Sequence, residues 1–220
     1  MASIAKRAAV SSVAAILVGC DVGGPQPTIE NTAGASGTAS PGTVVCTEEA
    51  DPLGTLMTAD DLAAGLESTG AVVDESAGAD SGFPPPAAFD ENDGRRLIRQ
   101  TWRSAGDIER GGLYGVDEFV WQFVTAEGAA AFFDAPAADL AGDADEDETL
   151  EPVGDNGRIF RDTSSGSLGT FDNYQFLFTA GNLAVKVAIS GLQPLDPSAA
   201  CHIAQAAEAR ATAFAEGPCT

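Results

Sequence analysis

The alternation of apolar and polar residues predicts β-strands in the middle and in the last third of the chain. Between Leu113 and Val124, apolar residues occupy both faces of an extended segment, which is typical of a central strand buried on two sides. Further strands are expected over 95–104, 158–163, 171–179 and 183–190. The last two flank Gly181-Asn182, a dipeptide that adopts positive φ at low cost, so we expect a hairpin there. In its second strand, the odd positions from 183 to 189 are expected to be buried and the even positions from 184 to 190 to face solvent.

Two segments before and between these strands have the residues that begin helices. Thr58 is followed by acidic residues and by leucines at helical spacing, which predicts a helix that ends at Gly70. Thr125 can cap a helix over 126–133, and Pro136 is expected to stop it, since proline restricts the residue before it to extended backbone.

The rest of the pattern predicts a last helix, a long loop and the fold class. The helix is expected from about Ser198 to Ala215, and Gly217-Pro218 would end it. The segment 74–93 contains three consecutive prolines and several acidic residues, so we expect a long disordered loop. Strands and helices that do not alternate regularly favour an α+β fold, with an antiparallel β-sheet packed against helices in a single domain over 46–220.

The first twenty residues have a different pattern. Lys6 and Arg7 precede an apolar stretch over 8–18, which is too short to cross a hydrocarbon core that requires about 20 apolar residues. The stretch closes with Leu17-Val18-Gly19-Cys20, which resembles the lipobox of bacterial lipoproteins. The resemblance implies that residues 1–19 are a signal peptide that is removed, and that Cys20 receives lipid.

The lipoprotein resemblance also predicts where the domain is held. Two or three acyl chains at Cys20 would anchor it stably in the lipid bilayer, on the extracytoplasmic face of the cell membrane. Residues 20–45 are rich in Gly, Pro, Ser, Thr and Ala and contain no aromatic residue, so we expect a disordered tether. In composition the chain is similar to small surface lipoproteins of high-GC bacteria, a similarity that assigns no domain family and no residue-level function.

The charge of the chain restricts its partners. The 220 residues include 33 acidic and 11 basic ones, for a net charge of −22. Loss of Lys6 and Arg7 with the signal peptide would leave 9 basic residues and a charge of −24. Such a surface repels phosphate backbones, so we expect no nucleic-acid partner.

The cysteines predict one disulfide outside the cytoplasm, where such bonds persist. Lipidation of Cys20 leaves Cys46, Cys201 and Cys219. More than ten helical residues would separate Cys201 from Cys219, which places their Cα atoms beyond the ~7 Å that a disulfide allows. Cys46 is therefore expected to form the disulfide, with Cys219 as its first candidate partner and Cys201 as the alternative.

The most unusual local feature is a group of arginines in an acidic chain. Arg95, Arg99 and Arg103 alternate along one predicted strand and therefore share a face. Guanidinium groups match carboxylate or phosphate, so these residues are the candidate ligand-binding site. The alternative interpretation is that neighbouring acidic residues neutralise them.

No pattern predicts catalysis, a metal or a cofactor. The acidic run 143–148 lacks the glycine and glutamate that a calcium-binding EF-hand loop needs at 148 and 154, and His202 has no partners at catalytic or zinc-binding spacing. We therefore predict a membrane-anchored, non-catalytic module that binds an unknown small ligand or another envelope protein. The alternatives are a structural or envelope-maintenance lipoprotein without a specific ligand and, last, a hydrolase.

Overall fold

A seven-stranded antiparallel sheet forms the centre of the computed structural model, which describes residues 51–62, 65–74 and 86–216. The order of the strands is β1-β2-β3-β7-β6-β5-β4. The strands are β1 (Leu66–Asp74), β2 (Gly94–Ser104), β3 (Leu113–Phe123), β4 (Asp145–Glu146), β5 (Asp155–Gly166), β6 (Gly169–Ala180) and β7 (Leu183–Leu192). The helices are the 3-10 turns η1 (Pro52–Thr55) and η2 (Ala59–Asp61) and the α-helices α1 (Pro86–Glu91), α2 (Ala126–Asp143) and α3 (Pro197–Ala215). The predicted α+β class is confirmed.

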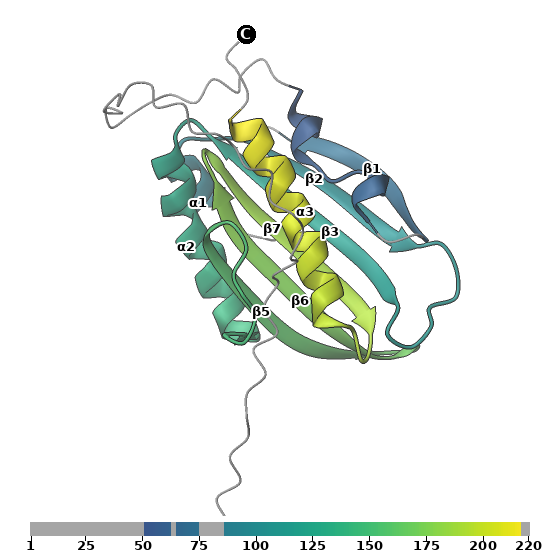
Figure 1. Ribbon diagram of the computed structural model, residues 1–220. Coiled ribbons are helices and arrows are strands. Elements are labelled where there is room, and N and C mark those ends of the chain that lie inside the picture. Colours follow the sequence, from purple (N-terminus) through teal and green to yellow (C-terminus); the bar gives the residue numbers. More distant parts are fainter. Residues whose placement is uncertain (1–50, 63–64, 75–85, 217–220) are drawn as a thin grey trace, which may run out of the picture.

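One face of the sheet, which we call the α3 face, is covered by α3, as Figure 1 shows. Small residues of the helix, such as Ala204 and Ala207, lie against a broad apolar surface that includes Val185 and Phe176. Small side chains allow the helix to approach the sheet closely. This interface forms the larger part of the core.

Helices α1 and α2 cover part of the opposite face, which we call the α2 face. Phe132 of α2 contacts the rings of Trp121 and Phe123 at centroid distances of 5.4 and 4.9 Å. Further along α2, Phe133 and Leu140 belong to a second cluster with strands β5 and β6. Because both faces carry helices, β3 is buried on two sides, as its apolar residues predicted.

The helix predicted between Thr58 and Gly70 is wrong. Asp61 accepts the backbone N–H of Thr58 at 2.7 Å, so the helix start is present, but only the single turn η2 follows it. The chain then enters β1, which pairs with β2. Gly65 and Gly70 adopt positive φ angles of 97° and 109°, which an α-helix does not contain. Pairing with β2 supplies the backbone hydrogen bonds instead.

Two other boundaries differ from the prediction. The helix that begins after Thr125 continues through Pro136 to Asp143, because residues beyond the proline bury apolar side chains against the sheet. Within the predicted loop over 74–93, residues 86–91 form α1, whose Phe89 packs against Phe123 and Phe132. The loop prediction is therefore corrected for the part that the structure describes.

Several predictions are confirmed. The hairpin of β6 and β7 turns at Gly181, whose φ is 55°, and α3 spans the predicted range. The odd positions of β7 are buried as expected, but Ala184 and Lys186 are buried too, because α2 covers that side of the strand. The expected solvent exposure of these two residues is wrong.

Cys201, at the start of α3, is buried and disulfide-bonded. Its partner lies outside the described residues, as do Cys20, Cys46 and Cys219 and the segments predicted to be a signal peptide and a tether. Within the described part of the chain, no helix is long and apolar enough to cross a membrane.

Candidate functional site

The α2 face is only partly covered by helices, and the remainder carries polar side chains. Three cross-strand rows of this face follow from the register: Arg99–Phe119–Lys186, Thr101–Asp117–Ala188 and Arg103–Gly115–Ser190–Asn173. Most of these residues are half-buried. We call the surface formed by these ten residues the open face. It includes two of the three arginines that the sequence pattern singled out.

Arg103 is neutralised within the open face. Its Nη2 donates to both carboxylate oxygens of Asp117, at 3.0 and 3.1 Å, and the hydroxyl of Thr101 donates to the same carboxylate at 2.7 Å. Gly115 makes room for this guanidinium, since a Cβ at that position would lie 2.7 Å from its Nη1. The alternative interpretation of the sequence, neutralisation by a neighbouring acidic residue, is therefore the one that holds for Arg103.

Arg99 differs from Arg103. Among the described residues, its side chain forms no ion pair and no hydrogen bond. It lines a hollow of about 430 Å³ at the β1 side of the open face. The other lining residues are Thr69, Gly70, Val72, Gln100, Thr101, Asp117 and Phe119. Because Asp117 is already bound by Arg103 and Thr101, the hollow presents an arginine whose charge has no carboxylate of its own.

Lys186 adds a second cation to the row of Arg99. Its Nζ lies 5.8 Å from the centroid of the Phe119 ring, and the residue is only 9% exposed. Burial lowers the pKa of Lys186 to about 8, although the negative charges of Asp139 and Asp117 act to raise this pKa. Phe119 therefore has a cationic residue as its register partner on each neighbouring strand.

The other two arginines of β2, Arg95 and Arg96, lie in environments different from that of Arg99. Arg95 lies at a bulge of β2 and makes an interaction of its own. Arg96 points to the α3 face, where its Nε donates to Gln122 at 2.6 Å. The predicted cluster of Arg95, Arg99 and Arg103 is thus divided among different environments, and of the three only Arg99 has no side-chain hydrogen bond or ion pair among the described residues while it lines the hollow.

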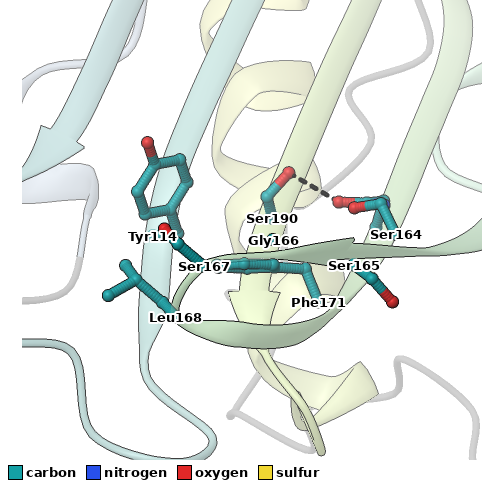
Figure 2. Close-up of a pocket in the computed structure, with 9 residues that line it drawn as sticks. Tyr114, Ser164, Ser165, Gly166, Ser167, Leu168, Phe171 and Ser190 are labelled. Carbon is teal, nitrogen blue, oxygen red and sulfur yellow. Dashed lines mark hydrogen bonds between the residues drawn. The ribbon is translucent and has the colours of Figure 1, made fainter.

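A second hollow, of about 290 Å³, lies at the other end of the open face, beside the turn between β5 and β6 (Figure 2). Its lining residues are Tyr114, Ser164, Ser165, Gly166, Ser167, Leu168, Phe171, Asn173 and Ser190. The Ser190 hydroxyl donates to the Asn173 side chain at 2.9 Å, and the Asn173 amide donates to Ser164 at 3.1 Å. No sequence pattern indicated this hollow, because four separate strand segments contribute to it.

The other candidates raised by the sequence are dispersed. His202 is exposed on α3. Within the acidic run, Asp145 and Glu146 form the short strand β4, and Arg158 donates two hydrogen bonds of 2.8 Å to Glu146. Among the described residues, no group of three His, Cys, Asp or Glu side chains could hold a metal ion.

The sequence pattern gave no prediction for Glu118, whose carboxyl group is buried. It lies on the α3 face of β3 with 0% exposure, and one of its oxygens accepts the backbone N–H of Met57 at 2.9 Å. Its other oxygen, Oε1, has no hydrogen-bond partner among the described residues. Burial raises the pKa of Glu118 to about 8. An acid between Val116 and Val120, on a face otherwise apolar, was the signal that could have revealed it.

Comparison with known proteins supports the fold and assigns no family. No protein-family model matches the chain, and no curated protein matches its sequence. Among solved structures, it is similar to the crystal structure of the extracellular domain of PknH from Mycobacterium tuberculosis. The two are 15% identical with a TM-score of 0.53, and the match covers 71% of this chain and 92% of that one. At this identity the likeness shows a shared fold alone.

Proposed function

We propose that this protein is a lipid-anchored extracytoplasmic domain that binds an anionic group of a small ligand or envelope protein on its open face. The observation that carries the proposal is Arg99, which lines a hollow and has no ion-pair partner among the described residues. In a chain with net charge −22, a cation beside an open hollow is an unusual arrangement. It is suited to receive a carboxylate or phosphate.

The location outside the cytoplasm rests on three supports. The Leu17-Val18-Gly19-Cys20 motif follows a secretory type of leader. Cys201 is disulfide-bonded, and such bonds persist in oxidising compartments. The solved structure with a similar fold is an extracellular domain. With Cys20 lipidated, Cys46 is the proposed partner of Cys201, which was the alternative pairing in the sequence.

A role in binding rather than catalysis is supported by the state of the polar groups on the open face. Asp117 is bound by Arg103 and Thr101, so it is occupied by internal contacts. The carboxyl group with the strongly raised pKa, Glu118, lies on the opposite face of the same strand and is fully buried. Lys186, whose pKa burial lowers to about 8, is only 9% exposed and so offers a bound substrate little access.

Titration with inorganic phosphate at constant ionic strength tests the anion site in the lipoprotein reconstituted in phospholipid nanodiscs. Trp121 is a suitable fluorescent reporter, because its ring stacks on that of Phe119, which lines the hollow. The two ring centroids are 5.9 Å apart. We expect saturable binding that Arg99→Gln weakens by roughly 10- to 100-fold, since a charged hydrogen bond is worth about 1.5–3 kcal/mol. Arg110→Gln is the matched control, because Arg110 donates to the carbonyl of Gln193 away from the hollow.

The outcomes decide the proposal directly. Loss of phosphate binding in Arg99→Gln but not in Arg110→Gln supports it. Equal binding by wild type and Arg99→Gln, or no saturable binding by either, overturns the anion site.

A further inference from the structure

The hollow beside the β5–β6 turn is neutral. In a chain in which 20% of the residues are charged, none of its nine lining residues is an Asp, Glu, Lys or Arg. The lining combines hydroxyl groups, one amide, glycine and two aromatic rings. Tyr, Ser, Gly and Asn are the residues that antibody binding sites favour, because they supply rigid amphipathic surface and adaptable hydrogen bonds.

The polar side of the hollow is held in place by hydrogen bonds. Asn173 accepts from Ser190 and donates to Ser164, and its amide also donates to Asp162 on β5. This network fixes the side chains of three neighbouring strands. A hydroxyl group can donate and accept at once, so Ser164 and Ser190 keep capacity for an additional partner. The arrangement suits a ligand that itself carries hydroxyl groups.

The apolar side of the hollow is exposed. Tyr114 is 42% exposed and its ring lies edge-on to Phe171 at 5.3 Å, while Leu168 at the tip of the turn is 60% exposed. Figure 2 shows Tyr114 and Leu168 on one side and Ser164 on the other. Turn formation explains the glycines and serines of this segment, but it does not explain an exposed leucine beside an exposed tyrosine. An amphipathic ligand would cover both.

We propose that this hollow binds a neutral, polyhydroxylated ligand, a single sugar ring, with the apolar C–H face of the ring against Tyr114 and its hydroxyl groups toward Ser164 and Ser190. Its volume of about 290 Å³ suits one ring rather than a long chain. Ligand pockets of drug size begin near ~300 Å³. The site is separate from the anion site at Arg99, and its lining includes no arginine.

Saturation-transfer NMR with the lipoprotein in phospholipid nanodiscs tests the proposal. The probes are glucose, galactose, mannose and N-acetylglucosamine at roughly 10 mM, a range suited to millimolar affinity. We expect saturation of ring C–H protons by at least one of these sugars. Tyr114→Ala should weaken binding about tenfold, because it removes the stacking surface. Ser190→Ala should weaken it by a smaller factor, since one neutral hydrogen bond is lost.

Two control variants show whether the sugar signal comes from this hollow. Val73→Ala removes an equally exposed apolar side chain from β1, at 41% exposure, and should leave the sugar signal unchanged. Arg99→Gln should also leave it unchanged, so failure of the anion site and failure of the sugar site are distinguishable. Absence of saturation for all four sugars, or an unchanged signal in Tyr114→Ala, overturns the proposal.

Discussion

Glu118 should make the stability of this domain depend strongly on pH. Its carboxyl group is fully buried, and its pKa is raised from 4.5 to about 8 by loss of hydration. A folded-state pKa above the unfolded value means that the folded state is more stable when Glu118 is protonated than when it is ionised. The contribution of protonated Glu118 to the free energy of unfolding is fully present below the unfolded pKa, near 4.5. It is lost as the pH rises toward the folded pKa, near 8.

The size of the effect follows from the shift. A difference of about 3.5 pKa units corresponds to roughly 5 kcal/mol over the whole range, at 1.36 kcal/mol per unit. Between pH 5 and pH 7, this group alone should reduce the free energy of unfolding by about 2–3 kcal/mol. The interval is accessible to urea denaturation followed by circular dichroism.

Glu118→Gln isolates this contribution, because glutamine keeps the shape of the side chain and an oxygen that can accept the N–H of Met57. We expect the variant to be more stable than wild type at pH 8 and to have a flatter dependence on pH. Glu67→Gln, at an exposed position of β1, makes the same chemical change and should keep the wild-type dependence. If Glu118→Gln retains the wild-type slope between pH 5 and pH 8, the reasoning about Glu118 is refuted.

Two further predictions concern the glycines and the disulfide. Gly115→Ala would place a Cβ 2.7 Å from Arg103 Nη1 and 2.9 Å from the carbonyl oxygen of Trp102, so we expect a loss of about 1–3 kcal/mol in urea unfolding. Gly142→Ala is its control: no atom lies within 4 Å of the added Cβ on α2, and a gain of about 0.5–1 kcal/mol is expected. Peptide mapping without reduction should recover Cys46 linked to Cys201, and a Cys201–Cys219 peptide would contradict the proposed pairing.

Local patterns were sufficient for the strands that form the middle of the sheet. The residues of β3 and of the β6–β7 hairpin carry their own signals, namely apolar residues at alternating positions and a Gly-Asn turn. The first strand has no comparable signal, because a genuine helix start at Thr58 precedes it. Its strand structure comes from pairing with β2, which is a contact distant in sequence.

The candidate sites depended even more on distant contacts. The sequence placed Arg99 and Arg103 on one face, but only the register of β2 against β3 sets Arg103 beside Asp117 and Arg99 beside Phe119. Burial of Lys186 requires α2 above it, which alternation within β7 could not indicate. The hollow proposed to bind sugar was not predictable, since Tyr114, Ser190 and Ser164 meet only when β3, β7, β6 and β5 align.

Native mass spectrometry of the mature lipoprotein, purified from its own membrane in mild detergent, tests the account most directly. We predict a chain that begins at Cys20, carries the added mass of its acyl groups and retains a bound anionic ligand. Arg99→Gln should keep the acyl mass and lose the ligand. A mature chain without acyl mass would contradict the anchor, and a ligand retained by Arg99→Gln would contradict the open face as its binding site.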